Sequence, residues 1–190
     1  MRRVLIVLGA VALVAVVVIG LGQAGGGGEE PQASTFDLEQ AKRELAGAPA
    51  PLAGLYEQSN TILDGGKDAF DERLEALEGR PVVINKWGSW CRPCRAEFPI
   101  FQQVATEHGK EVAFLGVNAG DKRPAAEQFL AERPLPYPSY EDPDEDIARE
   151  LDAAKFFPMT IFRDADGKTF VKAGEYTSRA ELEADIDKYL

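Results

Sequence analysis

The chain has 190 residues, of which 21 are basic and 32 acidic, giving a formal net charge of −11. A surface this acidic repels phosphate backbones, which argues against nucleic acid as a partner. Two cysteines and one histidine are too few for a disulfide-stapled scaffold, an iron–sulfur protein or a zinc site built from Cys and His ligands alone. The part from Phe36 onward, roughly 155 residues, suffices for one domain with a hydrophobic core.

Residues 1–22 are expected to be a transmembrane signal anchor. They contain an uncharged stretch, Val4–Gly22, preceded by Arg2 and Arg3. A helix of that length spans about 28 Å, close to the hydrocarbon thickness of about 30 Å. The leading arginines favour a cytoplasmic N-terminus, so we expect the rest of the chain outside the cytoplasm. A cleaved signal peptide is the alternative, because Gly22-Gln23-Ala24 at the end of the stretch is a tolerable cleavage site. No cysteine stands directly after the stretch, so a lipoprotein anchor is not expected.

The remaining chain divides into three parts by composition. Residues 23–35 contain four consecutive glycines and predict a flexible linker. Residues 36–66 are expected to be an N-terminal extension that packs on the domain, with a helix over 38–45 and a second short helix within 52–63. Residues 67–190 are expected to form the domain that carries the chemistry.

Within 67–190, helical spacing of apolar residues alternates with short β-branched runs. Strands separated by helices imply parallel pairing, and Asp166–Gly167 signals a closing antiparallel hairpin, so the fold class is α/β with a mixed sheet. In chain order, the first expected elements are a helix over Phe70–Leu77 with Asp68 as N-cap, a strand over Pro81–Asn85, a helix from Cys94 to near Gly109 and a strand over Val112–Val117. A helix over Pro124–Glu132, an extended connector over Pro134–Pro138 and a short helix over Asp144–Leu151 follow. The last elements are a strand from Thr160, a strand over Thr169–Lys172 and a final helix capped by Ser178 and Glu181.

Cys91 and Cys94 stand at an expected strand-to-helix junction. A disulfide between them closes a very short loop and constrains the unfolded chain little, so a structural role explains the pair poorly. A redox role fits better, because unpaired N–H groups and the dipole at a helix N-terminus stabilise a thiolate at Cys91. Cys94, one turn later, is placed to attack a mixed disulfide at Cys91. Arg92 and Arg95 add positive charge nearby.

Other uses of a Cys-x-x-Cys pair require residues that are missing. Haem attachment needs a histidine directly after the second cysteine, where this chain has Arg95. Zinc or copper needs further strong ligands, and only His108 could supply a nitrogen. We interpret His108 instead as a helix-capping cation or a surface residue. No metal and no cofactor is expected beyond a redox-active disulfide.

Several motifs together resemble the thioredoxin superfamily, and within it membrane-tethered TlpA/ResA-like thiol–disulfide oxidoreductases. These are Trp-x-x-Trp-Cys-x-x-Cys at Trp87–Cys94, Cys-x-Pro-Cys-x-x-Glu-x-Pro at Cys91–Pro99, Phe-Pro-Met-Thr at Phe157–Thr160, and the closing strand–Asp-x-Asp-Gly–strand. The resemblance covers roughly Phe70–Leu190. It implies a thioredoxin-like three-layer fold with a central mixed β-sheet.

The resemblance also implies roles for four catalytic residues. Cys91 is the exposed attacking thiol and Cys94 the resolving thiol. Pro158 is the cis-proline that lies against the disulfide and leaves a main-chain edge free for a partner polypeptide. Glu97 matches a glutamate thought to assist proton transfer, although a glutamate that merely complements the helix dipole is an equal alternative.

The substrate-binding residues expected from the same resemblance are Trp90, Arg92, Pro93 and Phe157. Trp90 is expected to present an aromatic surface, and Trp87 to lie in the core. The chain departs from the pattern at two positions. Asn85 stands where classical thioredoxins have a titrating aspartate, and Lys86 replaces a usually apolar residue, so its amine must reach solvent or a carboxylate.

The expected function is a membrane-tethered, extracytoplasmic reductase of protein disulfides. The resemblance suggests envelope clients such as apocytochrome c, and electrons from a membrane thiol donor. A dithiol oxidase is one alternative, because Arg92 favours the thiolate and hence the reduced form. A tethered, non-catalytic domain that binds peptides beside Pro158 is another. A thiol peroxidase is disfavoured, because no threonine stands about four residues before Cys91.

Overall fold

The computed structural model describes residues 36–190. The predicted anchor, cleavage site and linker therefore lie outside the described residues. None of the helices within 36–190 combines the length and apolar character that a membrane crossing needs.

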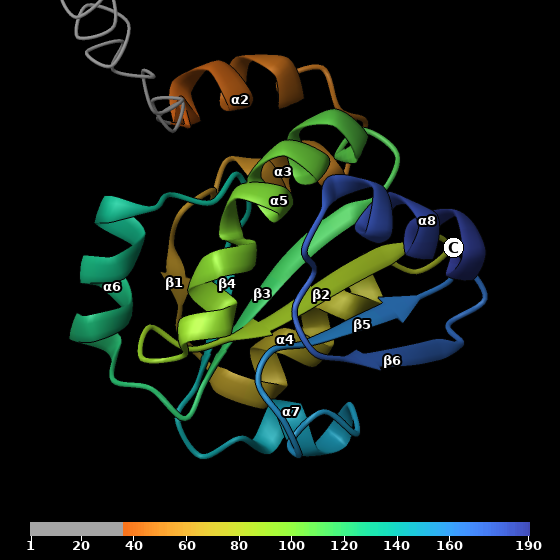
Figure 1. Cartoon of the computed structure of the whole chain (residues 1–190). Coiled ribbons are helices and arrows are strands. Elements are labelled where there is room, and N and C mark those ends of the chain that lie inside the picture. Colours follow the sequence, from red (N-terminus) through yellow and green to blue (C-terminus); the bar gives the residue numbers. More distant parts are fainter. Residues whose placement is uncertain (1–35) are drawn as a thin grey trace, which may run out of the picture. The chain divides into compact units, whose positions relative to one another are not determined.

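A six-stranded mixed sheet forms the centre of the fold (Figure 1), in the order β1-β4-β3-β2-β5-β6. Strands β1, β4, β3 and β2 run parallel to one another, whereas β5 pairs antiparallel with both β2 and β6. The predicted α/β class with a mixed sheet is confirmed. In chain order the strands are β1 Ile62–Leu63, β2 Val82–Trp87, β3 Ala113–Ala119, β4 Ser139–Asp142, β5 Met159–Arg163 and β6 Thr169–Ala173.

Helices cover both faces of the sheet (Figure 1): α5 and α8 lie in front of it and α4 behind it, and α7 lies below, in contact with α4. These are the three layers that the sequence predicts. Because both faces are covered, every residue of β2 and β3 is buried. The helices are α2 Leu38–Leu45, α3 Leu52–Tyr56, α4 Gly66–Ala76, α5 Arg92–His108, α6 Arg123–Glu132, α7 Asp146–Glu150 and α8 Arg179–Tyr189.

Alternation along β2 sends neighbouring side chains to opposite faces, and this decides where the polar residues of the site lie. Asn85 contacts Glu97 of α5 on the front face. Lys86 contacts Glu145, at the start of α7, on the back face. Trp87 returns to the front, where it packs against Phe98 of α5 with ring centroids 5.2 Å apart.

The sequence analysis did not predict two of the strands, β1 and β4. Ile62 and Leu63 were expected at the end of a helix, but they form β1 and pair with Ser139 and Tyr140 of β4. The β4 segment follows the predicted proline-rich connector, and its sequence Ser-Tyr-Glu-Asp lacks the β-branched residues typical of a strand. Pairing with β3 and β1, rather than local propensity, makes it a strand. Residues 36–66 thus contribute a strand to the sheet, and the domain boundary at 66 stays a prediction.

Two helix boundaries and one capping contact also differ from expectation. Helix α4 begins at Gly66 after Gly65, whose left-handed φ of 90° suits a residue without a side chain, and Asp68 lies within its first turn. Helix α7 is shorter than predicted and follows Glu145, which has a left-handed φ of 58°. At α8, Ser178 caps as expected by accepting from the amide of Glu181 at 3.4 Å, but the Glu181 carboxylate binds the amide of Thr177.

Candidate active site

Cys91 and Cys94 are joined by a disulfide at the junction between β2 and α5. Cys91 is the N-cap of the 17-residue helix α5 and has an extended backbone. Its Sγ accepts a hydrogen bond from the backbone N–H of Cys94 at 3.1 Å. The prediction that Cys91 stands where a helix begins is therefore confirmed, and a free N–H of the first turn points at its sulfur.

The exposure of Cys91 differs from expectation. The resemblance implies an exposed attacking thiol, but the residue is only 3% exposed in the disulfide form, and Cys94 is fully buried. The prediction is wrong for this form, because the Cys91 sulfur is bonded to that of buried Cys94 and drawn toward the amide at the helix start. Arg92 is exposed and Pro93 half-buried beside the pair.

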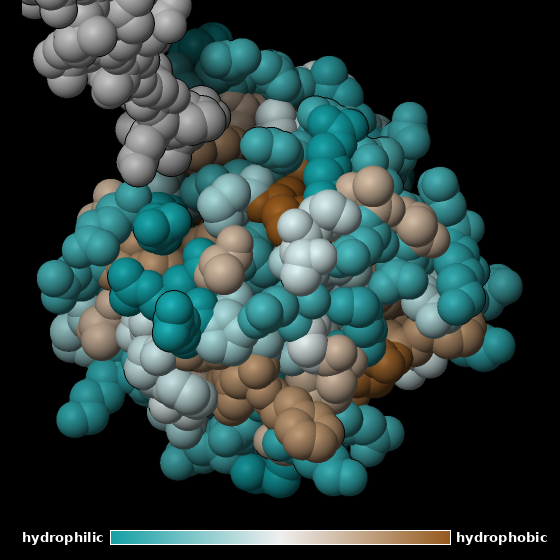
Figure 2. Space-filling model, viewed as in Figure 1, coloured by the Kyte–Doolittle hydropathy of each residue, from teal (hydrophilic) through white to brown (hydrophobic). Residues whose placement is uncertain are grey.

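Aromatic side chains form the surface next to the disulfide. Trp90 is 57% exposed, as the prediction of an aromatic surface requires, and Phe156 is 55% exposed. The rings of Trp90 and Phe157 pack together with centroids 4.7 Å apart. The Phe157–Pro158 peptide bond is cis, as expected. Figure 2 shows hydrophobic atoms gathered in the lower middle of the front view, near α7, on a face that is otherwise largely hydrophilic.

Glu97 lies one turn after Cys94 and is fully buried. Its Oε1 accepts from the side-chain amide of Asn85 at 2.8 Å, and its Oε2 accepts from the backbone N–H of Tyr176 at 3.1 Å. Burial raises the pKa of the Glu97 carboxyl to about 8, although these two hydrogen bonds favour the charged form. A buried carboxyl with a pKa near neutrality can take up and release a proton during catalysis.

Further polar atoms lie buried in the core. Among the described residues, Asn85 Oδ1, Thr160 Oγ1 and the hydroxyl of Tyr137 have no hydrogen-bond partner. Asn85 and Thr160 face each other across the β2–β5 ladder. Burial, followed by the negative charge of Glu97, raises the pKa of Tyr137. Glu97 thus influences a polar group besides those it binds directly.

The two departures noted in strand β2 are both resolved by partners. Asn85 binds Glu97, and Lys86, which is fully buried, reaches a carboxylate: its Nζ lies 2.8 Å from Oε2 of Glu145. Trp87 lies in the core as predicted, and its indole N–H donates to Ser139 Oγ at 3.1 Å.

Asp121 is a residue of the site that the sequence prediction missed. Its carboxylate accepts from the backbone N–H of Ser89 at 2.6 Å, from the Ser89 hydroxyl at 3.0 Å and from the side-chain amide of Asn118 at 3.0 Å. It thereby fastens the loop before Cys91 to the loop after β3. The signal was present in the sequence, because the carboxyl ends of adjacent parallel strands meet at one edge of a sheet.

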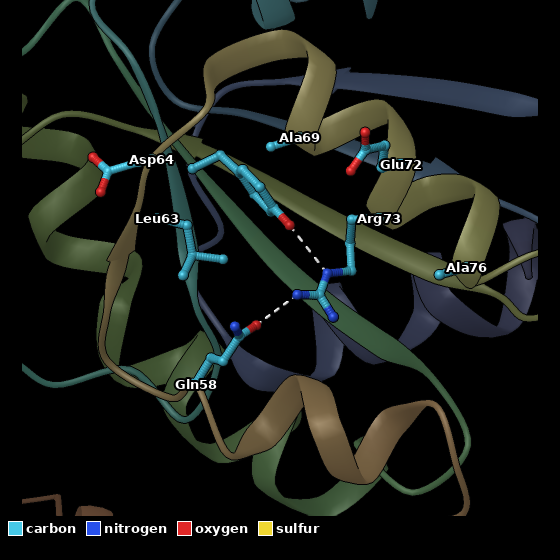
Figure 3. Close-up of a pocket in the computed structure, with 8 residues that line it drawn as sticks. Gln58, Leu63, Asp64, Ala69, Glu72, Arg73 and Ala76 are labelled. Carbon is cyan, nitrogen blue, oxygen red and sulfur yellow. Dashed lines mark hydrogen bonds between the residues drawn. The ribbon is translucent and has the colours of Figure 1, made fainter.

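A cavity of about 350 Å³ lies elsewhere, between α4, β1 and β4 (Figure 3). Arg73 crosses it, donating to the Tyr140 hydroxyl at 3.0 Å and to Gln58 Oε1 at 2.5 Å. None of its lining residues belongs to the cysteine loop or to the segment around Pro158. They are Gln58, Leu63, Asp64, Ala69, Glu72, Arg73, Ala76 and Tyr140.

His108 ends α5, as expected for a capping or surface cation. Its Nε2 lies 3.4 Å from Glu183 Oε1, and with Glu107 these residues form the one group of three metal-type ligands found within 36–190. Arg179 is paired with both glutamates, which opposes binding of a cation there.

Comparisons with known proteins agree with the resemblance inferred from the motifs. Residues 61–170, more than half of the chain, match the AhpC/TSA family. The thiol-disulfide oxidoreductase ResA of Bacillus subtilis (strain 168) is 30% identical over 105 residues, which are 54% of this chain and 58% of that protein. The thiol:disulfide interchange protein DsbE of Pseudomonas fluorescens biotype C is 37% identical over 92 residues, 48% of this chain and 49% of that protein.

Among solved structures, a secreted disulfide oxidoreductase of Mycobacterium tuberculosis, homologous to E. coli DsbE, superposes with a TM-score of 0.55. It is 27% identical, and the match covers 60% of this chain and 85% of that one. The thioredoxin-like fold is thus shared with this structure. The chain spans about half the length of the curated relatives it matches.

Proposed function

The chain belongs to the AhpC/TSA family, and from this premise we propose that it is a protein thiol–disulfide oxidoreductase that reduces disulfides of proteins outside the cytoplasm. One observation carries the proposal: the Cys91 sulfur accepts a hydrogen bond from the Cys94 amide at the start of α5. The same arrangement stabilises a thiolate once the disulfide is reduced, and a thiolate is the nucleophile of disulfide exchange.

The reaction moves two electrons from the dithiol to the substrate in two exchanges. In the first, the Cys91 thiolate attacks one sulfur of the substrate disulfide, a Cys91–substrate bond forms, and one substrate thiolate leaves. In the second, Cys94 loses its proton and attacks the Cys91 sulfur, so the Cys91–Cys94 disulfide forms and the second substrate thiolate leaves. The substrate is then a dithiol. An external thiol donor must reduce the pair before the next turnover.

Glu97 is proposed as the group that takes the proton of Cys94 in the second exchange. Its position one turn along α5, its complete burial and its raised pKa support this role. Asn85 cannot titrate, but it holds one oxygen of Glu97 at 2.8 Å and so orients the carboxyl.

The protein substrate is proposed to bind over Trp90, Arg92, Pro93 and Phe157, with its backbone along the edge beside Pro158. The exposure of Trp90 and Arg92 supports this placement. A polypeptide that covers these residues excludes water from the cysteines, and its large apolar contact supplies affinity. Docking of this kind brings the substrate sulfur to the Cys91 thiolate.

We further propose that residues 1–22 hold the protein at the cell membrane and that the domain lies outside the cytoplasm. A membrane thiol protein supplies the electrons, and the clients are envelope proteins such as apocytochrome c. No cofactor other than the Cys91–Cys94 disulfide enters the scheme. Trapping with Cys94→Ala in whole cells tests these points, because the first exchange then stops at a mixed disulfide between Cys91 and its client. Membrane fractions that lack the trapped protein contradict the tether.

The activity is tested with the full chain and a model protein disulfide, using dithiothreitol as the electron source. We expect catalysed reduction by the natural protein and none above background by Cys91→Ser. Full activity of Cys91→Ser refutes the mechanism. Two results together favour a non-catalytic binding domain. The natural protein shows no catalytic activity, and the double variant Cys91→Ser/Cys94→Ser binds peptide with unchanged affinity.

The same hydrogen bond from the Cys94 amide supports a second candidate, a dithiol oxidase. Stabilising the Cys91 thiolate favours the reduced form and raises the reduction potential. The reduction potential of the Cys91–Cys94 pair separates the two functions: a value of about −270 mV indicates a reductase, and a value of about −120 mV indicates an oxidase.

A further inference from the structure

Lys86 is a fully buried lysine in the central strand β2, and all its polar contacts are made by the amine. Nζ lies 2.8 Å from Glu145 Oε2 and 2.9 Å from the carbonyl oxygen of Ala153. A third acceptor, the carbonyl oxygen of Phe156, lies at 3.3 Å. An ammonium group has three N–H donors, so this cage satisfies all of them. Two of the three acceptors belong to the segment that leads into Pro158.

Lys86 also contacts the aromatic surface directly. Its Nζ lies 3.5 Å from the centroid of the Phe157 ring, a distance at which a cation attracts the ring face. The Phe157 ring in turn packs on Trp90 at 4.7 Å. The buried amine of Lys86 thus contacts the Phe157 ring, and this ring packs against Trp90, the most exposed aromatic side chain of the described residues.

Glu145 continues the connection from the other side. The carbonyl oxygen of Asp142 accepts hydrogen bonds from the backbone N–H groups of both Gly120, at 3.0 Å, and Glu145, at 3.1 Å. The carbonyl oxygen of Gly120 accepts from the indole N–H of Trp90 at 3.0 Å. The contacts therefore form a closed circuit that runs from Lys86 through Phe157, Trp90, Gly120, Asp142 and Glu145 back to Lys86.

We propose that Lys86, paired with Glu145, is a positioning residue that holds the Phe156–Pro158 segment and the Phe157–Trp90 pair in the arrangement that binds polypeptide disulfides. The inference rests on the proposed function and assigns it a determinant of substrate affinity. Lys86 acts through Phe157 and the loop carbonyls.

The acidity of the Cys91 thiol is expected to be independent of this circuit. The Cys91 sulfur is bound by an amide of α5, on the front face of the sheet, whereas the Lys86 amine lies on the back face with Glu145. Replacing Lys86 by methionine keeps an apolar stem of similar length and removes the donors. The carbonyls of Ala153 and Phe156 then lose their anchor, and the loop gains freedom that substrate binding must remove.

The test uses the full-length Lys86→Met protein. With a protein disulfide, we expect KM to rise about tenfold while kcat changes by less than about twofold. With glutathione disulfide, which is too small to cover the aromatic pair, the rate should stay within about twofold of the natural protein. The pH dependence of Cys91 alkylation in the reduced protein should not move. Lys67→Met is the matched control, because Lys67 pairs with Asp71 and Glu150 rather than with Glu145 or the Phe157 ring, and it should leave KM unchanged.

Glu145→Gln is the second variant, and it decides the question if Lys86→Met does not fold. It keeps the shape and an acceptor oxygen but removes the charge, so KM for the protein disulfide should rise at least about threefold. An unchanged KM in the folded variants, or an equal loss with both substrates, overturns the inference. If the natural protein reduces neither substrate, the proposed function is contradicted instead. If the natural protein is active and KM is unchanged in Lys86→Met, only the role of Lys86 is contradicted.

Discussion

The side-chain amide of Asn85 donates a 2.8 Å hydrogen bond to Oε1 of Glu97, beneath the helix that begins at Cys91. The other oxygen is held by the amide of Tyr176. Both hydrogen bonds favour the carboxylate, yet burial outweighs them, and the pKa rises from an ordinary value of 4.5 to about 8. The pair therefore combines a fixed orientation with a carboxyl that changes protonation state close to neutral pH.

Glu97→Gln should slow the second exchange. In the natural protein the rate of that step should rise with pH and level off above about 8, because only the ionised Glu97 can accept the proton of Cys94. General-base assistance typically accelerates a reaction by about 10²-fold or more. We therefore expect the rate of the second exchange in Glu97→Gln to fall by a factor of that order and to show no inflection near pH 8. Single-turnover reduction of a protein disulfide between pH 6 and 9 measures it. Exposed Glu111→Gln is the control; an inflection that persists in Glu97→Gln assigns the titration to another group.

The same carboxyl should make stability depend on pH. Between pH 4.5 and about 8 the folded protein keeps the Glu97 proton that the unfolded chain has lost, so the free energy of unfolding falls as pH rises through this range. Each pH unit corresponds to about 1.4 kcal/mol at most. Glu97→Gln has no such proton, so its stability relative to the natural protein should increase from pH 5 to 8. Urea unfolding of the natural protein and of Glu97→Gln, each with the Cys91–Cys94 disulfide formed, measures this change between pH 5 and 8. A difference in the free energy of unfolding that stays constant with pH contradicts the prediction.

Much of this site could be predicted from the sequence, because the signals are local. The helix start at Cys91, the buried strand β2 and the cis bond before Pro158 follow from short motifs and their resemblance. The strands β1 and β4 could not be predicted, because their pairing joins residues more than 70 positions apart and their own composition is weak.

The contact partners of buried polar side chains could not be predicted from the sequence either. Lys86 clearly required a carboxylate, but nothing in the chain singled out Glu145, 59 positions away. The low exposure of Cys91 was missed for a related reason, since it depends on where the disulfide turns its sulfur.

Asp121→Ala should loosen the cysteine loop. The change removes the acceptor of both Ser89 hydrogen bonds, and we expect the free energy of unfolding to fall by about 1–3 kcal/mol. Hydrogen exchange at the Ser89 amide should accelerate more than exchange in the rest of the sheet. Asp164→Ala is the control, because Asp164 accepts two backbone hydrogen bonds in the distant β5–β6 turn. If Ser89 exchanges at the natural rate in Asp121→Ala, this carboxylate does not hold the loop.

Reduction should yield a Cys91 thiol that is more acidic than an ordinary cysteine. The N–H of Cys94 and the dipole of α5 stabilise the thiolate, so the pKa of Cys91 should lie below the usual value of about 8.5. The pH dependence of the rate of alkylation by iodoacetamide measures it, with Cys94→Ala leaving a single thiol. Arg92→Ala should shift this pKa little, and not at all in high salt, because Arg92 is exposed and its charge is screened. A half-maximal rate at pH 8.5 or above would show that the helix start does not activate Cys91, and the reductase mechanism would lose its nucleophile.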